Sequence, residues 1–171
     1  MNYDAPSYLA QIATDRHDLH KDHASSRPLS INYEGVGISG EVAFSAFSGI
    51  ACDLSERPSG DKGIDFIVPL LFSIDVKTAR IPNHLIHEKG KDFVDIYVLA
   101  EYVADGKPAN LIGWEYGIKL KNAPFKDFGY GIINHYIHRS KLRPMADLKT
   151  RLLRFTYDSQ TETAKGDGQE A

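Results

Sequence analysis

Four residues of this chain have the types and the spacing that metal-dependent hydrolysis requires. Asp65 and Asp75 each lie in a short apolar run, Lys77 comes two residues after Asp75, and Glu41 lies upstream. Mg²⁺ prefers hard oxygen ligands and keeps several waters, so two or three carboxylates suffice to hold it. The metal can acidify water and clamp phosphate oxygens, and a nearby lysine can orient the attacking water and stabilise developing charge. We therefore predict a divalent-metal site that cleaves phosphodiesters.

Two strands and one helix are expected to position these side chains. Residues 64–68 and 71–79 have strand patterns, and alternation in the second places Asp75 and Lys77 on one face, roughly 6–7 Å apart along the strand. Glu41 lies near the start of a helix predicted over residues 39–52, whose apolar residues recur at helical spacing. Two structural alternatives stay open. The strand pattern also fits a solvated face with ion pairs, and Glu41 also fits a first-turn acid favoured by the helix dipole.

The remaining segments predict an α/β domain. A helix is predicted over residues 7–20, a polar connection over 80–92, and a central strand over 93–103, because that segment is nearly continuous in apolar residues. Residues 111–116 read as its antiparallel partner. Residues 122–131 are loop-like, and 130–138 fit strand or helix. Pro144 suits the first turn of a last helix.

Length and composition favour one soluble globular domain. The chain has 171 residues with 42% hydrophobic content, which is enough for an ordinary core. The first twenty residues lack an apolar signal core, and no run of about 18 apolar residues predicts a membrane span. Cys52 is the sole cysteine, so an internal disulfide is excluded. We expect a cytoplasmic protein, in the host cytoplasm if it is phage-encoded.

The net charge of −3 is unevenly distributed along the chain. Residues 158–171 are acidic and polar, and we predict that residues 157–171 form a disordered tail. Residues 139–154 are predominantly basic. A local basic face is what a phosphate-backbone partner requires, although a solvated helix face would have the same composition. Candidate backbone contacts are Arg80, Arg139, Lys141 and Arg143.

The order of these motifs resembles the PD-(D/E)XK nuclease superfamily, in particular its phage-type members. Glu41 comes first, followed by Gly63-Ile64-Asp65 and then by Asp75-Val76-Lys77. The resemblance covers roughly residues 36–148. It implies a restriction endonuclease-like core, in which a mixed central sheet of about four to five strands is flanked by helices. The predicted organisation is an N-terminal helical extension (1–34), a nuclease-like core (35–156) and the tail.

The resemblance also implies a role for each site residue. Asp65 and Asp75 would bind Mg²⁺, for which Mn²⁺ can substitute, and the Val76 carbonyl would be an added ligand. Glu41 would hold the metal or its water, and Lys77 would position the nucleophilic water. The substrate would be DNA, and a homodimer is an option because many members cut two strands with two copies. One departure is Ile64, which stands where proline is common in the group.

The sequence also allows other functions. The chain could be a catalytically silent nucleic-acid-binding or phage interaction module on the same fold, or an RNA-directed or junction-specific nuclease. Histidines three residues apart, such as His84 and His87 or His135 and His138, invite a zinc interpretation. Structural zinc normally has four ligands that usually include cysteine, so we interpret them as surface histidines. Residues 35–40 match GxGxxG by count, but they do not clearly follow a strand.

Overall fold

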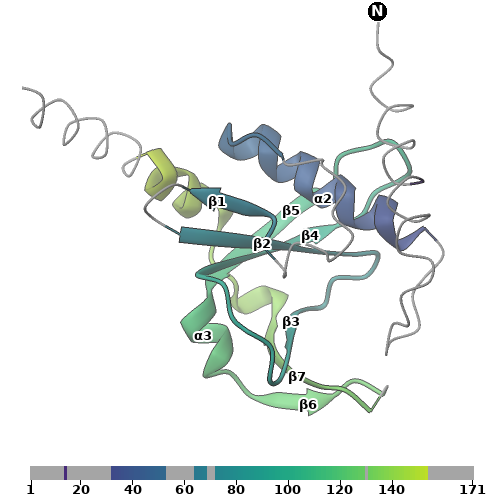
Figure 1. The fold of residues 1–171 in the computed structure, drawn as a ribbon, viewed down its shortest axis with the longest axis vertical. Coiled ribbons are helices and arrows are strands. Elements are labelled where there is room, and N and C mark those ends of the chain that lie inside the picture. The colour runs from purple at the N-terminus through teal and green to yellow at the C-terminus, as the bar shows by residue number, and fades with distance from the viewer. Residues whose placement is uncertain (1–13, 15–31, 53–63, 69–71, 130, 154–171) are drawn as a thin grey trace, which may run out of the picture.

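The computed structural model describes Thr14 and residues 32–52, 64–68, 72–129 and 131–153. Within these residues the chain forms a four-stranded sheet, a separate three-stranded sheet and several helices (Figure 1). The predicted helix over residues 7–20 and the predicted tail lie outside the described residues, apart from Thr14. The predicted α/β class is therefore confirmed.

The four-stranded sheet is mixed, as predicted, and has the order β1-β2-β4-β5. β1 (Phe66–Val68) pairs antiparallel with β2 (Phe72–Ala79), and β2 pairs parallel with β4 (Ile96–Glu101). β5 (Asn110–Tyr116) pairs antiparallel with β4, which confirms the predicted partnership. β4 is buried along almost its whole length, because it lies between two strands and is covered on both faces.

α2 (Tyr33–Ser48) packs on one face of this sheet. It begins at Tyr33 rather than near Ser39 and ends at Ser48 rather than at Cys52. The C-terminal limit has a local cause, because Gly49 adopts a left-handed conformation (φ 76°) and its N–H bonds the Ser45 carbonyl. The glycines at positions 35, 37 and 40 therefore lie within the helix.

Each face of the sheet has its own core. On the α2 face, Phe44 packs with Ile74, Val98 and Trp114, and all four are fully or almost fully buried. On the opposite face, Leu85, Tyr97, Leu99 and Leu120 form a second cluster. The alternation predicted for residues 72–78 is thus confirmed, since Ile74 and Val76 belong to the first core while Asp75 and Lys77 face the second.

The second cluster is covered by a sheet that sequence analysis did not predict. β3 (His84–Glu88) lies within the expected polar connection, and it pairs with β7 (Ile133–His138), which pairs with β6 (Phe125–Asp127). Within the ambiguous segment 130–138, residues Ile133–His138 are strand. β6 lies inside the loop predicted over residues 122–131, and α3 (Gly117–Lys121), which precedes that loop, was not predicted. In Figure 1 this small sheet lies below the four-stranded sheet, away from α2.

The chain then turns through a short 3₁₀ helix, η1 (Arg139–Lys141), into a helix over residues 145–153. Leu148 and Leu152 of this helix are buried against the α2-side core, as the apolar spacing after Pro144 predicts. None of the helices in the described part of the chain is long and apolar enough to cross a membrane.

Candidate acidic site at the open edge of strand β2

Strand alternation places Asp75 and Lys77 side by side on one face of β2. The Lys77 ammonium lies 2.5 Å from the Asp75 carboxylate, whose side chain is 4% exposed, whereas the Lys77 side chain is 38% exposed. The carboxylate is thus held inside the fold and the ammonium at its rim. A buried carboxylate is costly unless a cation or hydrogen-bond donors compensate its charge. Lys77 therefore stabilises the charge of Asp75.

Asp65 occupies the point where β1 leaves β2. The Asp65 N–H donates to the Ile74 carbonyl at 3.0 Å, and the Asp65 carboxylate accepts a 2.6 Å hydrogen bond from the Val76 N–H. The described pairing of β1 with β2 ends at Phe66 and Ile74, while β2 continues to Ala79. The side chain of Asp65 therefore takes the place of the next strand residue and brings its carboxylate to the open edge of β2.

Glu41 approaches this edge from α2. The helix can lie close to the sheet because a glycine is the contact residue: a Cβ at Gly40 would lie 1.9 Å from the Thr78 hydroxyl oxygen. That hydroxyl is buried and has no hydrogen-bond partner among the described residues. The Cys52 thiol lies 3.7 Å from a Glu41 carboxylate oxygen, so the end of the helix segment folds back toward Glu41. Gly40 thus sets how near Glu41 comes to β2.

The electrostatics of Asp65 show that the three carboxylates form one group. Burial raises the pKa of Asp65 well above its ordinary value, and the negative charges of Asp75 and Glu41 raise it further. The hydrogen bond from Val76 and the charge of Lys77 act in the opposite direction. The structure therefore brings together all four residues that the sequence singled out, from α2, the start of β1 and the middle of β2.

The side chains of this group have the types that a hard divalent cation prefers. The three carboxylates, whose like charges repel one another, offer oxygen ligands of the kind that Mg²⁺ prefers. Val76 directs its N–H toward Asp65, and because a strand residue sends N–H and C=O to the same neighbour, its carbonyl faces the same edge. Within the described residues, no three His, Cys, Asp or Glu side chains already stand at metal-binding distances. The residue types fit a cation, but the Asp75 carboxylate is engaged with Lys77 in this conformation.

Two residues that sequence analysis missed lie behind this group. The Tyr97 hydroxyl contacts His87 Nδ1 at 3.1 Å and accepts from the Val94 N–H at 3.2 Å. Burial raises the pKa of Tyr97 to about 12, with a further contribution from Asp75. Burial lowers the pKa of His87, and the charge of Lys77 is among the lesser causes. Tyr97 is the parallel partner of Asp75 in β4, a register that no local sequence pattern could reveal.

The histidines that are three residues apart do not share a face of their strand, and they are not all at the surface. His84 and His87 are three residues apart on β3 and so point to opposite faces, and the same holds for His135 and His138 on β7. His87 and His135 are buried. The interpretation as surface histidines is therefore wrong for these two, because the second sheet turns them inward against Phe93.

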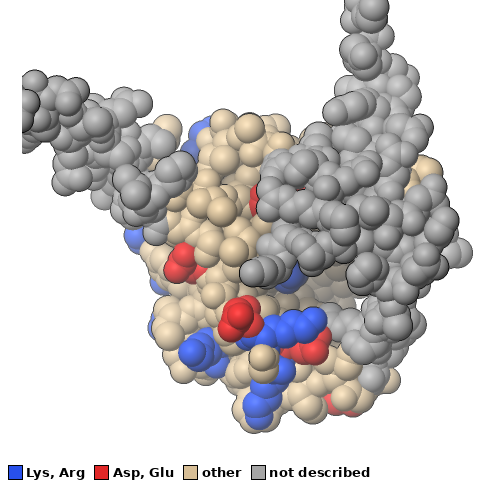
Figure 2. Space-filling model, in the orientation of Figure 1, with Lys and Arg blue, Asp and Glu red and all other residues tan. Residues whose placement is uncertain are grey.

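The four predicted backbone-contacting cations fall into two groups. Arg80 is exposed and lies 4.7 Å from the Tyr102 ring centroid, and Lys141 is exposed in η1. Arg139 is half-buried, and its N–H bonds the Asn83 carbonyl, which places η1 beside the segment after β2. Arg143 differs, because its guanidinium pairs with the buried carboxylate of Glu115 at 3.0 Å. Figure 2 shows Lys and Arg interspersed with Asp and Glu in the region of the small sheet.

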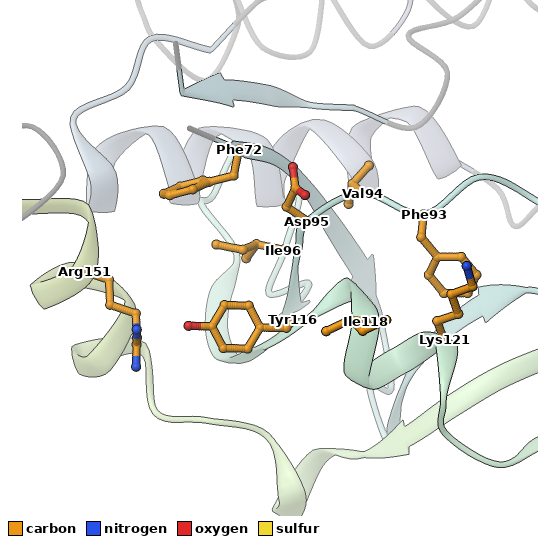
Figure 3. A pocket seen from close by; sticks show the side chains of 9 residues that line it. All are labelled: Phe72, Phe93, Val94, Asp95, Ile96, Tyr116, Ile118, Lys121 and Arg151. Carbon is orange, nitrogen blue, oxygen red and sulfur yellow. The ribbon is translucent and has the colours of Figure 1, made fainter. Parts of the chain in front are cut away.

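A cavity of about 440 Å³ lies apart from the carboxylates. Figure 3 shows Phe72, Ile96 and Tyr116 on its apolar side and Lys121 and Arg151 at opposite ends. Phe72 and Tyr116 pack against the α2-side core, on the face of the sheet opposite to Asp75. None of the four acidic-site residues lines this cavity. This cavity is therefore separate from the acidic group.

Comparisons with known proteins give no family for the chain. No protein-family model matches it, and neither curated proteins nor solved structures show a significant match.

Proposed function

We propose that this protein is a metal-dependent nuclease that hydrolyses DNA phosphodiesters at the group formed by Glu41, Asp65, Asp75 and Lys77. The observation that carries the proposal is geometric: Asp65 is hydrogen-bonded to Val76, between Asp75 and Lys77 of β2, which are themselves ion-paired. The charges of Asp75 and Glu41 add to burial in raising the pKa of Asp65. Carboxylates from three separate elements converge at one strand edge, although like charges repel. Groups whose pKa values are perturbed by burial and by specific charge partners cluster at functional sites.

Each residue has a role that its position supports. Asp65 and Asp75 would hold Mg²⁺ or Mn²⁺, with the Val76 carbonyl as an added ligand and Glu41 as a ligand to the metal or to its water. When bound, the metal would supply an acidified water and neutralise phosphate charge. The ammonium of Lys77, which is partly exposed at the rim of the site, would donate to the attacking water or to a phosphate oxygen. Removal of one such donor typically costs about 3–4 kcal/mol of transition-state stabilisation.

The ion pair also defines the conformational change that the proposal requires. Lys77 contacts Oδ2 of Asp75, one of the two carboxylate oxygens that could bind a cation. On metal binding, the ammonium would have to turn from that oxygen toward the solvent side, where its side chain is already partly exposed. A long, flexible side chain can do this without movement of the backbone.

The decisive experiment is cleavage of supercoiled, linear, single-stranded and branched DNA, and of RNA, in Mg²⁺ and in Mn²⁺. We expect wild-type protein to cleave DNA only with metal and Asp75→Asn to be inactive. Asp92→Asn is the matched control, because Asp92 is an exposed carboxylate outside the group. Equal cleavage by Asp75→Asn and wild type would refute the proposal, and cleavage confined to RNA would change its substrate.

A second candidate is a nucleic-acid-binding module that keeps this group without catalysis. It is favoured by the ion pair between Lys77 and Asp75, which neutralises the most buried carboxylate without any metal. Calorimetric titration of the protein with Mn²⁺ separates the two candidates. A catalytic site should bind the ion in a manner that Asp65→Asn weakens, whereas a silent module should show no such carboxylate-dependent binding. The homodimer stays a prediction that sedimentation velocity would check.

A further inference from the structure

The three-stranded sheet has an outer face with its own chemistry. On β3, burial alternates so that Leu85 and His87 face the core while His84, Ile86 and Glu88 are half-exposed. Register pairs His84 with His138 and Ile86 with Tyr136, and it pairs Lys126 of β6 with Asn134. Since side chains of paired residues share a face, these positions define one surface. We call it the outer face: His84, Ile86, Glu88, Lys126, Tyr136 and His138, with the adjoining Phe128.

Rings dominate one end of the outer face. The His84 ring centroid lies 5.2 to 5.4 Å from those of His138, Tyr136 and Phe128, and the Phe128 and Tyr136 rings are 5.6 Å apart. The interplanar angles run from 63° to 89°, so the rings hold one another edge to face rather than in parallel stacks. All four side chains keep part of their surface exposed. An aromatic group of this kind usually lies in a core, and here it lies at the surface.

Cations accompany these rings. Lys126 Nζ lies 4.5 Å from the Phe128 centroid and 5.1 Å from that of Tyr136. Arg139 and Lys141 follow directly after His138 at the same end of β7. The acids nearby are otherwise engaged: Glu88, at the other end of the face, pairs with Lys91 at 3.2 Å, and Asp127 accepts from the N–H groups of a turn. Ring surfaces and positive charge thus alternate across the aromatic end.

We propose that the outer face binds single-stranded nucleic acid, with bases stacked on Phe128, Tyr136 and His84 and phosphates held by Lys126, Arg139 and Lys141. Bases offer a ring face whatever their sequence, and rings interleaved with cations are the usual platform for unpaired strands. A duplex buries its base faces and cannot use the rings. A purely apolar protein partner would not match the lysine and the histidines set among them.

This inference deepens the proposed nuclease function and rests on it for one part, namely that the bound strand is the substrate. The outer face and the acidic group lie on opposite sides of the small sheet, because His87 on its inner face contacts Tyr97, which is the β4 partner of Asp75. Binding and cleavage can therefore be measured separately. A substrate with an unpaired segment, such as a branch or an overhang, would engage both surfaces.

The test uses full-length protein carrying Asp75→Asn, in EDTA, and fluorescence anisotropy with a labelled oligothymidine, the matching oligouridine and a duplex of equal length. We expect tight, salt-dependent binding of single strands and weaker binding of the duplex. Tyr136→Ala and Phe128→Ala should each weaken single-strand binding roughly tenfold, in line with the loss of one stacked base. Lys126→Ala should weaken it and lower the slope of log K against log salt by about one.

Two variants serve as controls. Phe125 is also an exposed aromatic residue of β6, with 53% of its surface exposed, but register places it with His135 on the inner side. Phe125→Ala should therefore leave binding unchanged, and Tyr136→Trp should restore it. Thermal unfolding shows whether each variant is folded, and Lys126→Ala, which alters an exposed side chain, tests the proposal even if Tyr136→Ala unfolds.

The outcomes separate the inference from the proposed function. Single-strand binding that depends on Tyr136 and Lys126, in a protein that cleaves nothing, would keep the platform and refute the nuclease. Cleavage that depends on Asp75, with single-strand binding indifferent to Tyr136, Phe128 and Lys126, would refute the platform alone. Stronger binding of the duplex than of single strands would also overturn it. Preference for oligouridine over oligothymidine would assign the platform to RNA.

Discussion

The carboxylate of Asp65 accepts a 2.6 Å hydrogen bond from the backbone N–H of Val76 on the neighbouring strand. The side chain thereby continues a ladder that the backbone of β1 has left. At this position the charges of Glu41 on α2 and of Asp75 on β2 both act on the Asp65 carboxylate and raise its pKa beyond the effect of burial. The site therefore depends on where β1 begins, directly after Asp65, as well as on which acidic residues are present.

Gly40→Ala should destabilise the protein and displace Glu41. A Cβ at this position would lie 1.9 Å from Thr78 Oγ1, so α2 would have to move away from β2. Overpacking of this kind costs about 1–3 kcal/mol. Gly37→Ala on the same helix is the matched control, because its Cβ would meet nothing within 4 Å, and it should stabilise by about 0.5–1 kcal/mol. Urea unfolding measures both, and equal effects would show that Gly40 does not set the helix position.

Lys77→Met should abolish cleavage and also destabilise the fold, because it leaves the buried Asp75 carboxylate without its cation. The double variant Asp75→Asn/Lys77→Met should recover most of that stability while staying inactive. We expect its unfolding free energy to lie closer to that of wild type than to that of Lys77→Met. Denaturant unfolding completes the cycle. If the two single variants are simply additive in the double variant, the residues are not energetically coupled.

Stability without metal should depend on pH through Asp65. Because its pKa is raised in the folded protein, the contribution of Asp65 is fully present below the unfolded pKa of about 4 and is lost as pH rises through the folded value. Asp65→Asn stays neutral and its amide oxygen can still accept from Val76. In EDTA, this variant should match wild type near pH 4 and exceed it in unfolding free energy at pH 8.

The control for the pH experiment is Asp92→Asn, which removes an exposed carboxylate and should show the same profile as wild type. Addition of Mg²⁺ at pH 8 should stabilise wild type more than Asp65→Asn, because a ligand stabilises only the state that binds it. A profile for Asp65→Asn parallel to that of wild type from pH 4 to pH 8 would contradict the assigned environment of Asp65.

Arg143→Ala and Lys141→Ala should have different effects, although sequence analysis grouped both residues as phosphate contacts. Arg143 pairs with Glu115, whose side chain is 11% exposed, while 37% of its own side chain is exposed. Loss of this partly screened pair should cost about 1–2 kcal/mol of stability. Lys141→Ala should leave stability unchanged and weaken nucleic-acid binding. Thermal unfolding and anisotropy measure the two effects, and a stable Arg143→Ala would show that the pair with Glu115 is not structural.

The sequence alone determined the local parts of this site. The order of Glu41, Asp65, Asp75 and Lys77 on a helix and two strands, and the alternation that separates Asp75 and Lys77 from Ile74, depend on side chains a few residues apart. Periodicity of two or of about 3.6 residues is written in the sequence itself. The antiparallel β4–β5 pair was predicted from two successive strand patterns, whereas the mixed sheet was implied by the family resemblance.

Only the tertiary structure decided the rest. The small sheet was not predicted because β3 and β7 lie far apart in sequence. Even their nearest paired residues, Glu88 and Asn134, are 46 positions apart, so no local pattern reveals their pairing. The same is true of the pairing of Tyr97 with Asp75. It is also true of Arg143, which the sequence suggested as a phosphate-backbone contact and which pairs with Glu115 in the structure. Contacts between segments far apart in sequence are set by burial of the whole fold, which short-range periodicity does not encode.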